Sequence, residues 1–286
     1  MKHDAAYFDR EYNVRALLPE HPQIFARWAE RGAQTRRLRA CLCDLPYGES
    51  PAERLDYFPV QRESAPLLVF IHGGYWRSLD KSDFSWLAPR FGQHGVALAL
   101  PNYGLAPATR IEDMVRQQLA ALAWLYRNGD RLGFDPECIV VVGHSAGAHL
   151  AAMMLAALWP MYASDLSPTL VKGGLAISGI YDLAPLVHAP FVNGDLYLDE
   201  HRARALSPVH LPPATQAPLI TAVGALESAE FRRQTALIGR AWKGVFVRDV
   251  SMPRANHLTI VEELASPASL LFDAALELVR SSRRSR

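Results

Sequence analysis

The chain has 286 residues, of which 50% are hydrophobic and 21% are charged, and its formal net charge is +1. Such a composition can bury a substantial core and is unlike that of a disordered or collagen-like chain. The balanced charge argues against a nucleic-acid partner, and no apolar run reaches the roughly 18 residues that a membrane-spanning helix needs.

The cysteines and the start of the chain bear on compartment and metal content. Three cysteines are too few for a disulfide framework. Cys41 and Cys43 lack a second ligand pair at usable spacing, so we expect no metal, and Cys138 opens an apolar strand and is expected in the core. The first residues, MKHDAAYFDREY, lack the apolar stretch of a signal peptide. We therefore expect a cytoplasmic protein.

Residues 1–40 predict an N-terminal helical segment, because Ile24, Phe25 and Trp28 recur at helical spacing. This helix could cover a binding pocket as a lid, or simply dock on a sheet edge; the pattern leaves both open. Residues 41–286 are interpreted as one domain. Its irregular stretch 181–216 reads as an insertion between strands, of the kind that often builds a binding surface.

From residue 55 onward, short apolar runs alternate with helical patterns. The predicted strands are 67–73, 95–103, 138–145, 173–180, 217–225 and 245–252. The predicted helices are 81–93, 111–129, 146–159, 229–242 and 266–280. The strand segments are continuously apolar, which is typical of a mostly parallel sheet with helices on both faces. We predict an open α/β sheet.

The pentapeptide at 143–147, GHSAG, fits the pattern G-x-S-x-G at the point where a predicted strand meets a predicted helix. A sharp strand-to-helix turn needs small residues two positions on either side of the central one, and it holds the Ser145 hydroxyl above the sheet. The alternative is an ordinary serine cap on a helix. Because both glycines and the preceding strand are present, the pattern favours Ser145 as a nucleophile.

A serine hydroxyl needs a base, and in this arrangement the acid and then the histidine follow the serine along the chain. The histidines after Ser145 are His149, His188, His201, His210 and His257. Only His257 follows the last predicted strand, where a loop could carry it back to the serine, so we predict that His257 is the base.

The acid is expected after the strand that ends near residue 225. Glu227 lies in that loop and is our prediction for the acid. Glu230 falls in the first turn of the next helix, where an acidic side chain is common. Asp182, which follows the preceding strand, remains an alternative, with helix capping as its other explanation.

Residues 71–76 read IHGGYW and follow a buried strand. Glycines let the backbone pass close to a substrate, with its N–H groups turned toward a developing oxyanion. We predict that Gly73, Gly74 and Ala146 form the oxyanion hole. Tyr75 and Trp76 are expected to wall the substrate pocket, although core packing would also explain Trp76.

Taken together, these motifs resemble the α/β-hydrolase superfamily, in its branch of hormone-sensitive-lipase-like esterases with an HGG motif. The sequence is most similar to the kynurenine formamidase (arylformamidase) family. The shared features are HGGYW, YFDREYNVRALLP, LPYGES, SGIYDL and HLTIVE. The departures are Glu227 where the family has aspartate, and Asn102-Tyr103 at a strand end. The resemblance spans nearly the whole chain.

The resemblance implies an α/β-hydrolase fold and an enzyme of tryptophan catabolism that hydrolyses N-formylkynurenine without metal or organic cofactor. It implies Ser145, Glu227 and His257 as the triad, and His144 joins Tyr75 and Trp76 as an expected substrate-binding residue. A short-chain carboxylesterase and a non-catalytic binding module on the same fold are the alternatives. The expected partner is a small acyl or aryl formamide substrate, and a homodimer is left open.

Overall fold

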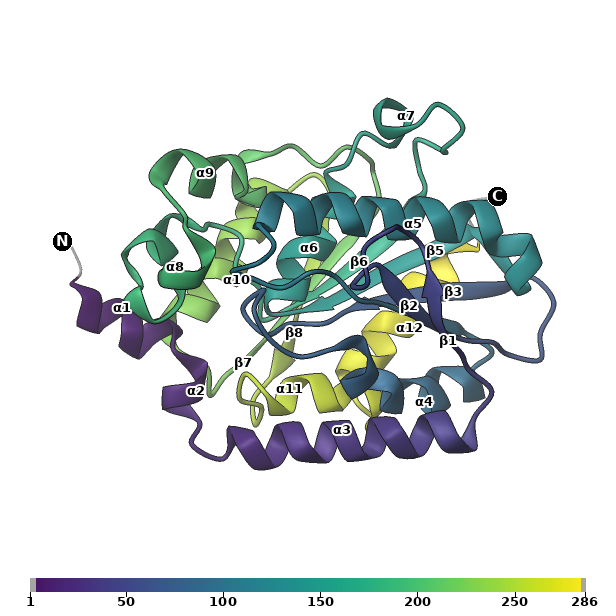
Figure 1. Ribbon diagram of the computed structural model, residues 1–286, viewed down its shortest axis with the longest axis horizontal. Helices are drawn as coiled ribbons and strands as arrows, with labels where there is room; N and C mark the ends of the chain where they lie inside the picture. Colours follow the sequence, from purple (N-terminus) through teal and green to yellow (C-terminus); the bar gives the residue numbers. More distant parts are fainter. Residues whose placement is uncertain (1–3, 284–286) are drawn as a thin grey trace.

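The computed structural model describes residues 4–283 and contains one eight-stranded sheet in the order β1-β2-β4-β3-β5-β6-β7-β8 (Figure 1). The strands are β1 (Leu42–Pro46), β2 (Arg54–Phe58), β3 (Ala65–Ile71), β4 (Ala97–Pro101), β5 (Phe134–His144), β6 (Val171–Ile177), β7 (Leu219–Gly224) and β8 (Phe246–Met252). Strands β3 to β8 pair in parallel, whereas β2 pairs antiparallel with β1 and β4. The α/β-hydrolase fold predicted from the sequence is confirmed.

The first two strands were not predicted. β1 is largely exposed, and a bulge interrupts its register with β2 between Leu42 and Leu45. Neither strand is a continuous apolar run of the kind that identifies the central strands. β1 (LCDLP) is an exposed edge strand, whereas β2 (RLDYF) is mostly buried but carries Asp56, which pairs with Lys81. The antiparallel pair β1–β2 therefore extends the sheet beyond β4, and its sequence has no apolar pattern from which the two strands could be predicted.

Helices cover both faces of the sheet. The α-helices are α1 (Ala5–Tyr12), α2 (Val14–Leu17), α3 (His21–Leu38), α4 (Ala88–Gln93), α5 (Ile111–Leu132), α6 (Ala146–Leu155), α7 (Trp159–Tyr162), α8 (Pro190–Leu196), α9 (Glu200–Ala205), α10 (Ala229–Ala241), α11 (Thr259–Glu262) and α12 (Leu270–Ser282). The 3₁₀ helices are η1 (Lys81–Leu87), η2 (Ala184–His188), η3 (Pro208–His210) and η4 (Glu263–Ala265). Figure 1 shows α5 and α6 on one face, with α4 and α12 on the other.

Two predicted segments differ from the structure in detail. Residues 81–93 begin as the 3₁₀ helix η1 and become α-helical only at Ala88. Asp80 fixes the start of η1, because its side chain and that of Asp83 cap each other's backbone in a capping box. The insertion 181–216 is less irregular than expected, since it contains η2, α8, α9 and η3.

The N-terminal segment packs on the rest of the molecule. Helix α3 packs along η1, and α1 packs on α10 and η2. Tyr12 donates to Glu230 at 2.7 Å, and Trp28 donates to Glu262 at 2.9 Å, so buried side chains at both ends anchor the segment. In Figure 1 the purple helix α3 runs along one side of the molecule, and α1 lies next to α8.

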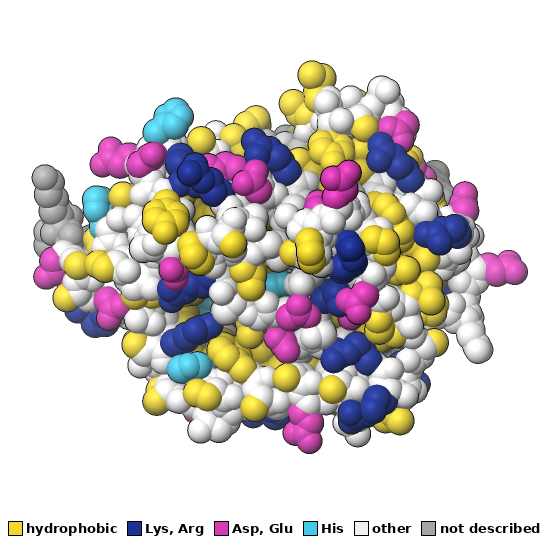
Figure 2. Space-filling model, viewed as in Figure 1, with side chains coloured by type: hydrophobic (Ala, Val, Ile, Leu, Met, Phe, Trp, Pro, Cys, Tyr) yellow, Lys and Arg dark blue, Asp and Glu magenta, His cyan; other side chains and the backbone are white. Residues whose placement is uncertain are grey.

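On the face shown in Figure 2, positively and negatively charged side chains are interspersed with scattered apolar ones. Such a mixed surface matches the near-neutral charge of the chain. Within residues 4–283, every helix is too short or too polar to span a bilayer.

The parallel strands determine where the functional loops meet. Because β3, β5, β7 and β8 run in the same direction, the segments that follow them leave at one edge of the sheet. These segments carry the HGG motif, Ser145, Glu227 and His257, respectively. Ligands of open α/β sheets bind at this carboxyl edge.

Candidate active site

Ser145 occupies the strained turn between β5 and α6. Its backbone has φ 56° and ψ −120°, a conformation that a non-glycine residue adopts only when its surroundings enforce it. A Cβ on Gly143 would lie 2.1 Å from the Gly147 carbonyl oxygen, and one on Gly147 would lie 2.0 Å from that of Ile71. Only glycine permits this crossing. Although Ser145 is the cap residue of α6, its side chain makes no capping hydrogen bond.

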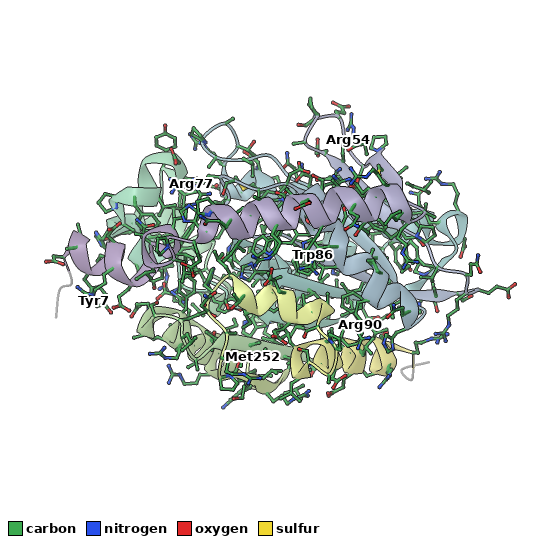
Figure 3. All side chains as sticks on the ribbon, turned by 90° about the horizontal axis from the view of Figure 1, so that it is seen from below. Tyr7, Arg54, Arg77, Trp86, Arg90 and Met252 are labelled. Carbon is green, nitrogen blue, oxygen red and sulfur yellow. The ribbon has the colours of Figure 1, made fainter. Side chains whose placement is uncertain are left out.

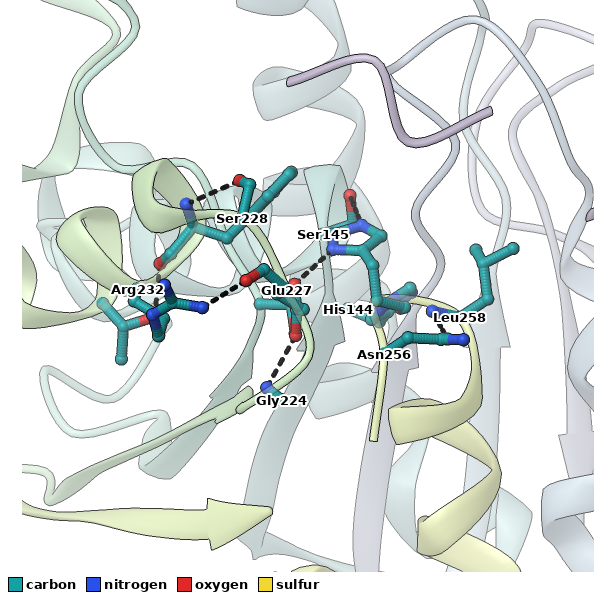
Figure 4. Close-up of polar contacts among 12 residues, drawn as sticks. His144, Ser145, Gly224, Glu227, Ser228, Arg232, Asn256 and Leu258 are labelled. Atoms are coloured by element: carbon teal, nitrogen blue, oxygen red, sulfur yellow. Dashed lines mark hydrogen bonds and ion pairs between the residues drawn. The ribbon is translucent and has the colours of Figure 1, made fainter. Parts of the chain in front are cut away.

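The hydroxyl of Ser145 instead meets His257. Its Oγ lies 2.9 Å from His257 Nε2, and His257 Nδ1 lies 2.6 Å from Glu227 Oε2 (Figure 4). All three residues are buried. The structure thus joins the predicted nucleophile, base and acid in one chain of hydrogen bonds.

The Glu227 carboxylate is held from its other side. Its Oε1 accepts hydrogen bonds from Ser178 Oγ at 2.5 Å and from the Gly224 N–H at 2.7 Å. These two donors leave Oε2 directed at His257. Ser178 comes from the loop after β6, and its role was not anticipated from the sequence.

The two other candidate acids lie elsewhere. Glu230 accepts hydrogen bonds from Tyr12 and Arg233, and it anchors the N-terminal segment. Burial pushes its pKa upward, but the hydrogen bonds from Arg233 and Tyr12 prevail and lower it. Asp182 accepts from the Ala184 N–H at 3.1 Å, at the start of η2, whose cap residue is Leu183.

The loop that carries His257 is shaped by its neighbours. Asn256 accepts hydrogen bonds from the N–H groups of Leu258 and Thr259 (Figure 4). Nε2 of His144 lies 2.7 Å from the carbonyl oxygen of His257. Burial lowers the pKa of His144 to about 3, helped by the nearby His257, so this ring is neutral and Nε2–H donates.

The HGG loop lies directly beside Ser145. A Cβ on Gly73 would lie 2.7 Å from the His144 carbonyl oxygen and 3.0 Å from Ser145 Cβ. Within residues 4–283, the N–H groups of Gly73, Gly74 and Ala146 are not used in loop hydrogen bonds. Their role as oxyanion donors stays a prediction.

His72, the first residue of the HGG motif, is held in place by Asn102 and Tyr103. Its ring stacks on Tyr103 with centroids 4.4 Å apart, and its Nε2 lies 3.0 Å from Asn102 Oδ1. The Tyr103 hydroxyl donates to the His72 carbonyl oxygen at 2.8 Å. Asn102 and Tyr103, the departure noted at the β4 end, thus hold the start of the HGG motif.

Ser145 lines a cavity that is open to solvent. Its walls come from the N-terminal segment, the HGG loop, α8 and the catalytic loops. The lining residues are Asn13, Val14, Arg15, Phe25, Trp28, Gly74, Tyr75, Arg77, Leu79, His144, Ser145, Phe191, His257 and Leu258. Tyr75 and His144, two of the three residues expected to contact substrate, are in this lining.

Trp76 does not line this cavity. It is fully buried, and its ring meets His149 edge-on with centroids 5.2 Å apart. Of the two explanations for Trp76, the structure matches core packing beneath the loop.

Comparisons with known proteins agree with this geometry. Residues 55–159 match the BD-FAE family. Kynurenine formamidase of Danio rerio is 32% identical over 87% of this chain and 85% of its own length. That of Salmo salar is 31% identical over 93% and 90%, respectively. The chain belongs to the kynurenine formamidase family.

Solved structures support the same fold for this member of the kynurenine formamidase family. A Silicibacter protein, provisionally assigned as a thioesterase, superposes with a TM-score of 0.82 at 30% identity, covering 91% of this chain and 95% of that one. Esterase B of Lactobacillus rhamnosis gives a TM-score of 0.72 at 18% identity over 94% and 95%. The protein is accordingly a hydrolase of the α/β type.

Several cavity residues of this kynurenine formamidase family member were missed by sequence reasoning. Arg15, Arg77 and Phe191 all line the cavity. Arg77 immediately follows HGGYW, so proximity to that motif was an available signal. The other two come from segments whose docking depends on tertiary contacts.

One cluster in the described part of the chain has the residue types of a metal site. The ligand atoms of Cys41, Cys43 and Asp56 lie within 4.8 Å of one another at the β1–β2 edge of the sheet. The buried ammonium of Lys81 already donates to Asp56 at 2.7 Å and to Asp44 at 2.8 Å. A side chain of this protein thus supplies the positive charge beside Asp56.

Proposed function

We propose that this protein hydrolyses aryl formamides of the N-formylkynurenine type, with Ser145 as nucleophile. The observation that carries the proposal is the position of His257 between Ser145 and Glu227, at 2.9 Å and 2.6 Å. It occurs in a chain that is similar to kynurenine formamidases over nearly its full length.

The first half-reaction forms a formyl-enzyme. Ser145 Oγ attacks the formyl carbon while His257 Nε2 takes the hydroxyl proton, and Glu227 stabilises the imidazolium that results. The N–H groups of Gly73, Gly74 and Ala146 bind the negative oxygen of the tetrahedral intermediate. His257 then gives its proton to the departing nitrogen, and the C–N bond breaks to release the aryl amine.

The second half-reaction restores the enzyme. Water loses a proton to His257 and attacks the formyl ester, and the same N–H donors bind the second tetrahedral intermediate. The proton on His257 returns to Ser145 Oγ as the ester bond breaks. Formate leaves, so one water is consumed for each formamide cleaved.

The cavity walls suit an aryl substrate. Phe25, Trp28, Tyr75 and Phe191 line it. The rings of Tyr75 and Phe191 meet edge-to-face with centroids 5.4 Å apart. Aromatic contacts of this kind add about 0.5–1.5 kcal/mol beyond burial of area. We also propose that residues 1–40 act as a cover for the site, since Val14, Phe25 and Trp28 come from this segment.

The decisive experiment compares kcat/KM for N-formylkynurenine with that for p-nitrophenyl acetate and butyrate. A formamidase turns over the formamide far better, and the reverse ranking would indicate a short-chain carboxylesterase. The Ser145→Ala variant must lose turnover of all three while keeping its fold by circular dichroism. Failure of a fluorophosphonate to label wild-type Ser145 would favour a non-catalytic binding module.

A further inference from the structure

The cavity beside Ser145 is lined by two cationic side chains. Arg15 and Arg77 both line it, and its lining includes no aspartate or glutamate. The two guanidinium groups repel each other, and Arg15 is an exposed residue that a ligand can reach from solvent. Two like charges beside one cavity favour an anion there.

The two arginines differ in how they are compensated. Arg77 donates to Asp195 at 2.6 Å and to the Phe191 carbonyl oxygen at 2.8 Å, so its charge is neutralised and it ties α8 to the HGG loop. In Figure 3 Arg77 lies beside the green helices of the α8 region. Its hydrogen bonds leave it little freedom to serve a ligand.

Arg15, by contrast, forms no ion pair with any residue from 4 to 283. Its guanidinium donates to the neutral Ser78 hydroxyl at 2.6 Å and lies over the Phe25 ring, 5.7 Å from its centroid. Burial and the charge of Arg77 lower the pKa of Arg15 from its usual value. Because arginine stays protonated, this group is a cation held beside the cavity without a counterion.

Arg15 is also linked to the HGG loop. Ser78 Oγ, the acceptor for Arg15, donates in turn to the Gly74 carbonyl oxygen at 2.9 Å. One serine therefore connects the guanidinium to the HGG loop. An anionic group at Arg15 would lie in the same cavity as a formyl group at Ser145, with the aromatic walls available for the ring.

We propose that Arg15 binds a carboxylate of the substrate, so that the enzyme selects aryl formamides that carry an amino-acid carboxylate over neutral ones. This inference rests on the proposed formamidase function. It assigns the residue that binds the amino-acid end of the substrate, away from the formyl group. The planar guanidinium matches a carboxylate in two parallel hydrogen bonds, which ammonium groups cannot reproduce.

The test is a cycle of two substrates and three variants. The substrates are N-formylkynurenine and N-formylkynuramine, which has the same aryl formamide without the carboxylate. We expect Arg15→Gln to lower the kcat/KM ratio of the first substrate to the second by about 10- to 100-fold, through KM. Arg15→Lys should restore part of this ratio. Arg10→Gln removes the same charge from a side chain that is outside the cavity lining, and should leave the ratio unchanged.

An equal loss on both substrates in Arg15→Gln would overturn the inference, because it would mean that Arg15 only shapes the cavity. Binding of the products, kynurenine and kynuramine, to Ser145→Ala by calorimetry gives an answer independent of turnover. A preference for kynurenine that disappears in Ser145→Ala/Arg15→Gln supports the carboxylate site. If wild-type enzyme cleaves neither formamide, the proposed function fails, and the calorimetry still decides whether Arg15 binds a carboxylate.

Discussion

Glu227 Oε2 lies 2.6 Å from His257 Nδ1, while Glu230, three residues further along, faces away and is bonded to the N-terminal segment. Two nearby carboxylates thus have separate tasks because one precedes α10 and the other lies in its first turn. The Glu227 side chain is fully buried, which strengthens its interaction with an imidazolium that forms during the reaction.

The first prediction compares these two glutamates. Glu227→Gln replaces the charge that stabilises the imidazolium with an amide, and should lower kcat by about 10³- to 10⁴-fold, as removal of a triad acid does elsewhere. Glu230→Gln is the matched control and should keep kcat within about one order of magnitude, losing mainly stability. Steady-state kinetics of both variants decides the assignment. A larger loss of kcat in Glu230→Gln would reverse the roles of the two carboxylates.

The second prediction concerns Gly73. A methyl group there would lie 2.7 Å from the His144 carbonyl oxygen, so Gly73→Ala must push the HGG loop away from Ser145. We expect a loss of kcat of about 10²- to 10³-fold, similar to loss of one oxyanion donor. Gly244→Ala is the control, because a Cβ there meets nothing within 4 Å. Wild-type kcat in Gly73→Ala would remove this loop from the mechanism.

The third prediction concerns pH and His149. This buried ring has its pKa lowered to about 4 by burial, and its Nε2 lies 2.8 Å from the Leu206 carbonyl oxygen. The unfolded chain takes up a proton near pH 6.5, whereas the folded ring stays neutral until about pH 4. Acidification therefore favours the unfolded state. The contribution of His149 to the free energy of unfolding is fully present above pH 6.5 and is lost as the pH falls from 6.5 to about 4.

Between pH 7.5 and pH 5.0, His149 alone should lower the free energy of unfolding by about 2 kcal/mol. His149→Gln cannot titrate, so its urea-unfolding free energy should fall by about 2 kcal/mol less than that of wild type over this interval. His201→Gln, at an exposed position, should retain the wild-type difference. Identical pH dependence in all three proteins would show that the His149 ring is not held neutral.

The sequence could predict the catalytic edge of the sheet because its signals are local. The glycines around Ser145 are needed by a crossing of strand and helix, and the chain order of β5, β7 and β8 brings Ser145, Glu227 and His257 to one edge. The central strands were recognisable for a similar reason, as buried apolar runs.

The cavity walls could not be predicted in this way. Arg15 and Phe25 line the same cavity as Ser145 because the N-terminal segment docks across the molecule, through contacts such as that of Tyr12 with Glu230, which are 218 residues apart. No short-range periodicity encodes such a contact. Trp76 shows the converse limit, since an aromatic residue next to an oxyanion motif can point into the core as readily as toward the substrate.

The last prediction tests the N-terminal segment as a cover for the site. The Tyr12 hydroxyl donates to Glu230 at 2.7 Å and accepts from Gln234 at 3.0 Å, and the residues that follow Tyr12 line the cavity. Tyr12→Phe removes a buried hydroxyl and leaves its partners unsatisfied, which costs about 1–3 kcal/mol. Because this loosens Asn13 to Arg15 rather than the catalytic hydrogen bonds, we expect KM for N-formylkynurenine to rise several-fold with little change in kcat.

Tyr57→Phe provides the matched control for Tyr12→Phe. Its hydroxyl also makes a buried hydrogen bond, 2.9 Å from the Leu132 carbonyl oxygen, but it joins β2 to the end of α5 rather than to the N-terminal segment. Tyr57→Phe should therefore lower stability without raising KM. Limited proteolysis gives a second measurement, with faster cleavage within residues 13–20 expected only in Tyr12→Phe. If both variants raise KM equally, the effect comes from general loss of stability, and the segment does not act as a cover.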